Sequence, residues 1–190
     1  MFDKAIVSWF PLRVSYSSAS RLMKLKELLA QEDGVVDTYV PMAYKTINFE
    51  TVLAPVIDNL LFVRVDYEHL RKIKENRAIF EPLRYIMHPV LVDDVLRSEV
   101  LYVPDGQMKD FIRVTKEQND NVIFLKNMDF ACKPGTTVQI TKGMFAGVKG
   151  VVKSIKKHLC VVLPIKDVMA VAIINVPKKD LIYLKDENNN

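Results

Sequence analysis

The chain is poor in the features that point to export, to a membrane or to a fold held by disulfides. It has two cysteines, Cys132 and Cys160, in 190 residues, which is too few for a disulfide framework. No apolar run approaches the ~20 residues of a membrane-spanning helix, and runs such as residues 159–165, which contain a proline and are followed by a lysine, are short. Met1 to Lys4 carry an acid and lack the apolar segment of a signal peptide. We therefore expect a cytoplasmic protein with no membrane partner and with buried, inert cysteines.

Motifs that mark an enzyme are also missing. Gly143, Gly147 and Gly150 do not form a phosphate-binding loop, because they lead into a strand and lack the Gly-Lys-Ser/Thr ending. There is no nucleophile elbow, and His158 and Cys160 do not have the spacing of zinc ligands. We expect no catalytic residue, no metal and no cofactor, and hence a protein that is not an enzyme.

Arginine is absent from the C-terminal third. Residues 131–190 hold ten lysines and four acids, a balance of +6, whereas residues 1–115 hold 15 basic and 16 acidic residues and residues 116–130 hold two and three. A basic C-terminal part indicates an anionic or acidic partner. Solubilising lysines explain the same charge equally well, and lysine without arginine is a weak sign of specific nucleic-acid recognition.

Apolar patterning in the first 115 residues predicts alternating strands and helices. Ser17 and Ser18 offer a helix N-cap, Asp66 offers a second, and Gly34 ends the first helix. The expected elements are strand Ala5–Val14, helix to about Gln31, strand Val35–Tyr44, loop or hairpin Lys45–Ala54, strand Val56–Val65, helix to about Asn76, strand Leu83–Met87 and a helix from Pro104-Asp105. The order predicts an α+β fold with a split βαβ arrangement, in which helices cover one face of an antiparallel sheet.

The C-terminal part reads as short strands separated by turns. Residues 138–155 place the three glycines between two stretches of alternating apolar and polar residues, as a tight barrel corner requires. Five strands are expected near Val138, Val151, Val161, Val171 and Ile182, which suits a small closed β-barrel. The expected domains are 1–115 and 133–185, joined by a linker at 116–132 and followed by a frayed tail at 186–190. An apolar patch, Val122 to Leu125, interrupts the linker and is a candidate short strand.

Motifs in both parts resemble the NusG family of transcription elongation and antitermination factors. Trp9-Phe10 opens the first strand, Thr38-Tyr39-Val40-Pro41 lies in the second, and Leu61-Phe62-Val63 ends the third. Lys133-Pro134-Gly135 and residues 138–147 resemble the KOW domain that follows in that family. The resemblance implies a NusG-type N-terminal domain followed by a small SH3-like β-barrel.

The resemblance also implies a function. In the family, the N-terminal domain docks on the clamp helices of RNA polymerase, bridges the DNA cleft and suppresses pausing, while the KOW domain recruits a ribosomal protein or a termination factor. Where the family has Phe-Pro-Gly-Tyr, this chain has Ile57-Asp58-Asn59-Leu60. The change indicates a specialised paralogue similar to the UpxY type, which acts as an antiterminator on surface-polysaccharide operons. We expect a monomer that promotes read-through of specific operons.

Candidate residues fall into three groups. The polymerase-binding candidates are Phe10, Tyr39, Ile57 and Leu60. The candidates for DNA contact are Arg21, Lys24, Arg71 and Lys74, although a solvated helix face explains them as well. The KOW partner surface would include Lys142, Phe145 and Lys149. The alternative function is an RNA- or ribosome-binding KOW protein with an accessory N-terminal domain, and the Trp9 and Tyr39-Val40-Pro41 signature favours the polymerase-bound factor.

Overall fold

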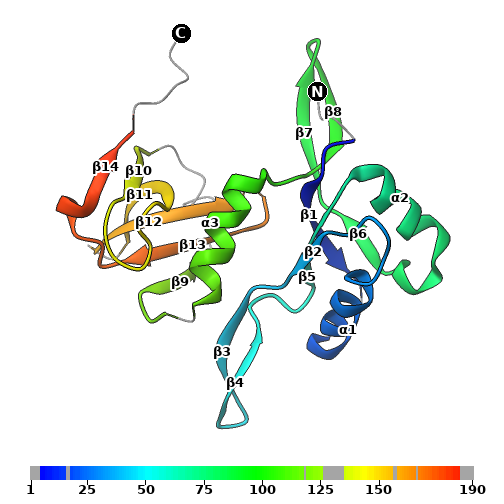
Figure 1. The fold of residues 1–190 in the computed structure, drawn as a ribbon, viewed down its shortest axis with the longest axis horizontal. Helices are drawn as coiled ribbons and strands as arrows, with labels where there is room; N and C mark the ends of the chain where they lie inside the picture. Colours follow the sequence, from blue (N-terminus) through cyan, green and yellow to red (C-terminus); the bar gives the residue numbers. More distant parts are fainter. Residues whose placement is uncertain are drawn as a thin grey trace. The chain divides into compact units, whose positions relative to one another are not determined.

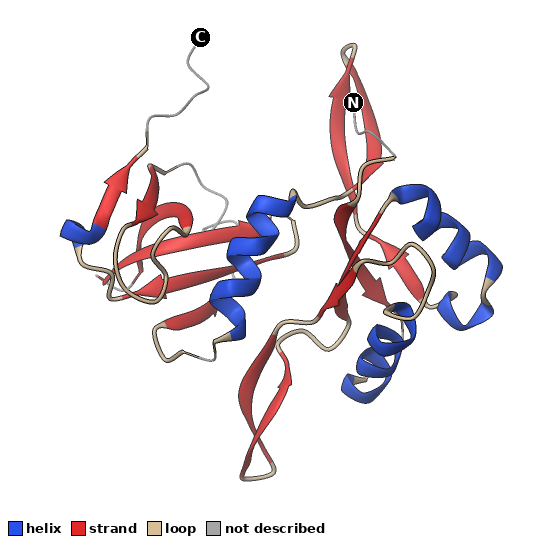
Figure 2. Ribbon diagram, in the orientation of Figure 1, coloured by secondary structure: helices blue, strands red, loops and turns tan. Residues whose placement is uncertain are grey.

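The computed structural model of the chain describes residues 5–15, 18–117, 119–125, 135–155, 158–165 and 167–184. Its contacts divide the chain into two compact units, residues 1–108 and 109–190. Helices and antiparallel strands are both present (Figure 2), so the expected α+β class is confirmed. The domain limits expected from the sequence stay a prediction. Cys132 and the expected tail lie outside the described residues.

A four-stranded antiparallel sheet with two helices on one face forms the centre of the first unit (Figure 1). Its strand order is β2 (Asp37–Tyr39), β5 (Leu60–Val65), β1 (Ser8–Val14) and β6 (Leu83–Tyr85). The helices are α1 (Ala19–Leu29) and α2 (Tyr67–Asn76), and a 3-10 turn, η1 (Ala78–Phe80), follows α2. Leucines of α1 share one core cluster with Leu70, Ile73, Phe10 and Leu61, so both helices cover the same face of the sheet.

Side-chain caps fix where the two helices begin. The Ser18 hydroxyl accepts a hydrogen bond from the Arg21 N–H at 3.3 Å, and an Asp66 carboxylate oxygen accepts one from the His69 N–H at 3.0 Å. The His69 ring also lies 2.6 Å from that carboxylate. Burial alone would raise the pKa of Asp66, but the hydrogen bonds with His69 outweigh it and hold the pKa below its usual range.

Two β-hairpins belong to the first unit in addition to the sheet. One pairs β3 (Met42–Ile47) with β4 (Glu50–Pro55), in the segment where the sequence predicted a loop or hairpin. The other pairs β7 (Met87–Val92) with β8 (Val95–Val100), and the sequence analysis did not predict it. Both have two-residue turns whose residues all have positive φ, as a type I′ turn requires.

The second unit is built on a six-stranded antiparallel sheet. Its order is β14 (Leu181–Tyr183), β10 (Thr137–Ile140), β11 (Lys149–Ile155), β12 (His158–Ile165), β13 (Met169–Ile174) and β9 (Val122–Leu125). The five expected strands are therefore present. The apolar patch in the expected linker is a sixth strand, because β9 pairs with β13 along its whole length. The 3-10 turn η2 (Lys178–Asp180) precedes β14. Strands β14 and β9 are the two edges of this sheet, so closure into a barrel stays a prediction.

Candidate functional surfaces

One face of the first-unit sheet carries aromatic and apolar residues that do not belong to the helix-covered core. We call it the outer face, and the strand register places on it Trp9, Pro11, Leu60, Phe62, Tyr39, Arg13, Arg64 and Arg84. Trp9 is only 4% exposed, and Leu60 and Phe62 are wholly buried. The outer face thus has an apolar centre, and around it lie arginines and one acid, Asp37, which is opposite Arg64.

Only two of the four polymerase-binding candidates lie on this face. Tyr39 lies opposite Phe62 in the register, and Leu60 lies opposite Arg13, so both belong to the outer face. Ile57 is partly exposed in the turn before β5, where its carbonyl accepts the Leu60 N–H at 3.3 Å.

Phe10 lies on the helix side of the sheet, wholly buried in the core, with its ring centroid 6.2 Å from that of Tyr67. Strand alternation turns it away from Trp9, so Phe10 offers no surface to a partner in this structure. Leu60 is also wholly buried, which makes it unsuitable as a surface probe.

Carboxylate and amide groups hold the arginines of the outer face. Arg13 donates to Asn59 Oδ1 at 3.0 Å, and burial lowers the pKa of Arg13. Arg64 forms a two-pronged ion pair with Asp105, whose hydrogen bond raises the pKa of Arg64. These contacts fix the orientation of the guanidinium groups beside the apolar centre.

The four basic candidates on the helices differ in what they can reach. Arg21 and Lys24 are exposed on α1, and Arg71 is exposed on α2, where it pairs with Glu68 at 2.9 Å. Lys74 is partly buried instead. Its ammonium lies 4.5 Å from the centroid of the Tyr85 ring and donates to the Leu83 carbonyl at 2.6 Å, and burial lowers the pKa of Lys74. Lys74 therefore serves packing within the unit.

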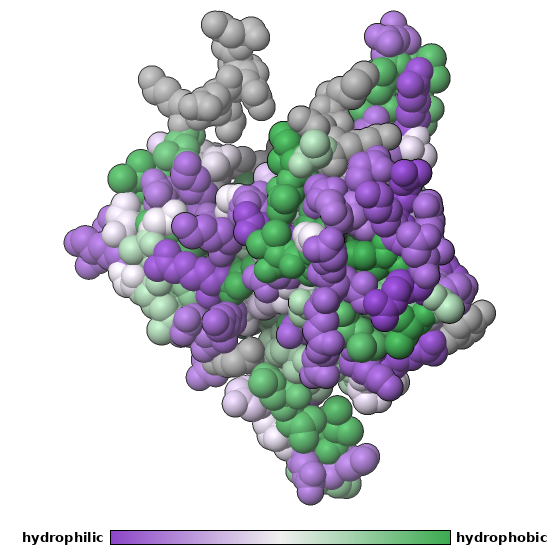
Figure 3. Space-filling model, turned by 45° about the vertical axis from the view of Figure 1, so that its right-hand side comes forward, coloured by the Kyte–Doolittle hydropathy of each residue, from purple (hydrophilic) through white to green (hydrophobic). Residues whose placement is uncertain are grey.

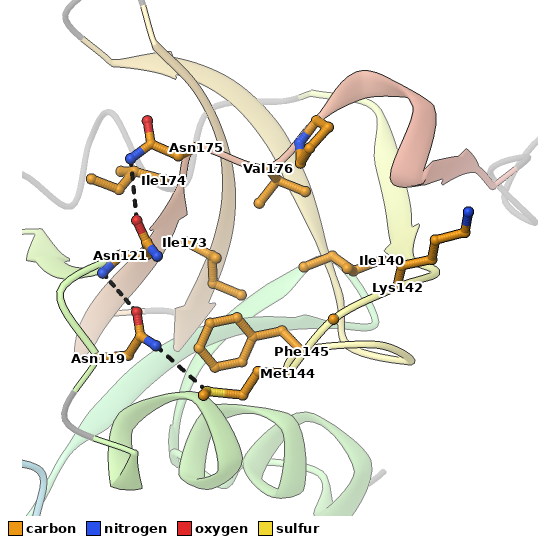
Figure 4. A pocket seen from close by; sticks show the side chains of 12 residues that line it. Asn119, Asn121, Ile140, Lys142, Met144, Phe145, Ile173, Ile174, Asn175 and Val176 are labelled. Atoms are coloured by element: carbon orange, nitrogen blue, oxygen red, sulfur yellow. Dashed lines mark hydrogen bonds between the residues drawn. The ribbon is translucent and has the colours of Figure 1, made fainter.

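A hollow of about 180 Å³ lies beside the glycine-rich turn of the second unit (Figure 4). Ile140, Ile173 and Phe145 give it an apolar lining, and Lys142 reaches its rim. Asparagines from outside the turn complete the rim and are linked by hydrogen bonds, Asn175 Nδ2 to Asn121 Oδ1 at 3.1 Å and Asn121 N to Asn119 Oδ1 at 2.8 Å. Of the predicted KOW surface residues, Lys142 and Phe145 thus line one hollow, although Phe145 is only 8% exposed, whereas Lys149 does not line it.

Helix α3 (Asp105–Lys116) holds the same turn through polar contacts. The Arg113 guanidinium donates to the carbonyl oxygens of Met144 at 2.7 Å and Ala146 at 2.8 Å. The Asp110 carboxylate accepts a hydrogen bond from the Lys149 N–H at 3.1 Å. Two side chains one helical turn apart therefore fix both sides of the glycine-rich turn.

The exposed apolar residues of the two hairpins are not among the candidate residues predicted from the sequence. Tyr44, Phe49 and Leu53 are exposed on the β3–β4 hairpin, and Leu91 and Leu96 on the β7–β8 hairpin. Figure 3 shows hydrophobic residues gathered along the β3–β4 hairpin, at the lower end of the view. The β-branched residues on either side of Asn48-Phe49, which are Thr46, Ile47, Thr51 and Val52, were the available signal for a hairpin.

Comparisons with known proteins found a distant likeness to a curated transcriptional regulator. No family model matches the chain. The chain is 26% identical over 121 residues to the transcriptional regulator GfcR of Methanosphaera stadtmanae, a match that covers 63% of this chain and 58% of that protein. The chain thus spans less than two thirds of the length of that relative. Among the described residues, no helix is both long enough and apolar enough to cross a membrane. The likeness is to a protein described as a transcriptional regulator.

Proposed function

We propose that this protein is a transcription elongation and antitermination factor that binds RNA polymerase through the first unit and promotes read-through of specific operons. The outer face is the observation that carries the proposal. Trp9, Pro11 and Phe62 lie on the face of the sheet that α1 and α2 do not cover, and they are buried in this structure. Aromatic residues flanked by arginines are typical of the centre of a protein interface.

The proposed partner surface is the clamp of RNA polymerase. The ground for this choice is the resemblance to the NusG family, whose N-terminal domain docks there. Trp9, Leu60 and Phe62 are buried in this structure, so docking through them requires the outer face to become accessible. Tyr39 and Ile57 are already partly exposed and would make the first contacts. Binding and positioning, without catalytic chemistry or a cofactor, would be sufficient for this role.

The other surfaces would hold nucleic acid and recruit further factors. Arg21, Lys24 and Arg71 are exposed cations that would contact DNA phosphates, with an affinity that falls as salt rises. The second unit would recruit a ribosomal protein or a termination factor. Its hollow also favours the second candidate function, RNA binding, because the asparagine amides and Lys142 that line it would hydrogen-bond to the edge of an unpaired base.

A pull-down of purified RNA polymerase by the full chain tests the proposal. We expect the wild type to capture polymerase and Ile57→Asp to reduce capture at least about tenfold, because a charge would be desolvated at the rim of an apolar contact. Ile182→Glu, an exposed apolar position in the second unit, is the matched control and should bind as the wild type does.

The same pull-down separates the two candidate functions. Capture of RNA without polymerase would contradict the polymerase proposal and favour the RNA-binding one. Normal capture by Ile57→Asp would remove the turn before β5 from the docking surface.

A further inference from the structure

The tip of the β3–β4 hairpin has an aromatic residue at a position where the geometry of the turn favours glycine. Ile47 and Glu50 form the closing pair, so Asn48 and Phe49 are the whole turn. Their φ values are 51° and 68°. The second position of a type I′ turn is normally glycine, because a Cβ is strained in this left-handed region. Phe49 occupies that position.

No packing of the Phe49 side chain offsets this strain. Its side chain is fully exposed, and Ile47 beside it is exposed as well. Tyr44 and Leu53 are directly paired across the two strands on one face of the hairpin, and they are 63% and 48% exposed. Strained and exposed apolar residues that do not serve the fold mark a contact with another molecule.

The charges of the hairpin decide what kind of molecule fits it. Residues 42–55 contain one cation, Lys45, and one acid, Glu50. The Lys45 ammonium is already 3.4 Å from Asp58 Oδ1. Glu50 follows Phe49 directly and would repel phosphates. Sites that stack unpaired bases on aromatic residues lie in positively charged grooves, which this hairpin does not supply. Its lack of net charge matches an uncharged apolar cleft on a protein.

We propose that Phe49 inserts into an apolar cleft of RNA polymerase, as a second contact separate from the outer face. This inference rests on the proposed function, which supplies the protein partner. The two-stranded hairpin presents Phe49 as the leading residue, and Tyr44 and Leu53 extend the apolar contact along one face. The αL strain at Phe49 persists because the aromatic ring is needed at the tip.

The substitution Phe49→Gly tests the proposal, because it separates binding from folding. It creates the favoured Asn-Gly turn, so the melting temperature should rise. The affinity of the full chain for purified RNA polymerase, measured by biolayer interferometry, should fall about tenfold or more, as loss of an aromatic anchor does. Asp94→Gly is the matched control, since Asp94 has φ 59° at the same position of the β7–β8 turn. It should leave the affinity unchanged.

The remaining outcomes decide against the proposal. Wild-type affinity in Phe49→Gly, together with weakened binding by Ile57→Asp, would overturn the hairpin contact and leave the polymerase function standing. Loss of binding by Phe49→Gly to a DNA–RNA scaffold without polymerase would overturn it in favour of nucleic acid. If the wild type does not bind polymerase, the proposed function and this inference both fall.

Discussion

Gly34 shows how a single backbone position constrains two elements of the first unit. It follows α1 with φ +78°, in the left-handed region that favours glycine. A Cβ at this position would lie 2.6 Å from Cγ of His69, the residue whose N–H is capped by Asp66 at the start of α2. Helix α1 itself ends at Leu29, with Ala30 as its C-cap, so the expectation that Gly34 ends this helix is wrong. The glycine instead lets α2 approach the chain that leaves α1.

We expect Gly34→Ala to lower the free energy of unfolding by about 3 kcal/mol, of which left-handed strain accounts for about 1–2 kcal/mol and the contact with His69 for the rest. Urea unfolding followed by the fluorescence of Trp9, the single tryptophan, measures this in the first unit. In a His69→Ala background, which removes the ring and keeps the Cβ at 3.0 Å, the cost of Gly34→Ala should fall towards the strain part. An equal cost in both backgrounds would show that the ring contact does not matter.

The sequence predicted some residue roles well and others not. Ser18 and Asp66 were recognisable as N-caps because each precedes an apolar helical pattern. Tyr39 and Leu60 were placed on one surface and do share the outer face. Phe10 was grouped with them because β1 is a nearly continuous apolar run, which hides the alternation that separates the two faces. The packing of Lys74 over Tyr85 depends on tertiary structure and leaves no local signal.

At the scale of elements, α3 and the glycine-rich turn of the second unit form one polar assembly. We expect Arg113→Lys to raise the amide exchange rate of residues 144–149 about tenfold. An ammonium cannot donate to both carbonyls as the forked guanidinium does, so one hydrogen bond is lost. A hydrogen bond to a charged group contributes about 1.5 kcal/mol, which corresponds to about a tenfold change in rate. Hydrogen–deuterium exchange of the full chain measures this. Lys109→Ala, an exposed change on the same helix, is the control. Unchanged exchange in Arg113→Lys would mean that α3 does not hold the turn.

The elements also differ in how predictable they were. The five strands β10 to β14 are rich in apolar residues, many of them β-branched, and all five were expected. The β7–β8 hairpin was not, because its turn is Asp93-Asp94 instead of Asn-Gly, and because its outward residues Leu91 and Leu96 are apolar and exposed. A hairpin without a buried face does not show the usual pattern of apolar and polar residues.

At the scale of the whole molecule, the uneven charge and the proposed polymerase contact predict a selective effect in the cell. Deleting the gene should reduce transcripts at the distal ends of a limited set of long operons and leave their promoter-proximal parts unchanged. RNA sequencing along each operon measures this. A uniform change across the genome would indicate a general elongation factor, and no distal loss in any operon would contradict antitermination.

The pairing of β9 with β13 has a practical consequence for work on the second unit. A fragment that begins at residue 133, after the expected linker, would lose β9 and leave the backbone groups of Ala170–Ile173 without their partners. The strand exposed in this way is almost wholly apolar, and unpaired apolar edges promote aggregation through intermolecular strand pairing. A fragment that begins at residue 109 keeps the covering strand and the part of α3 that holds Met144 and Ala146, and is the better starting point for crystallisation or NMR.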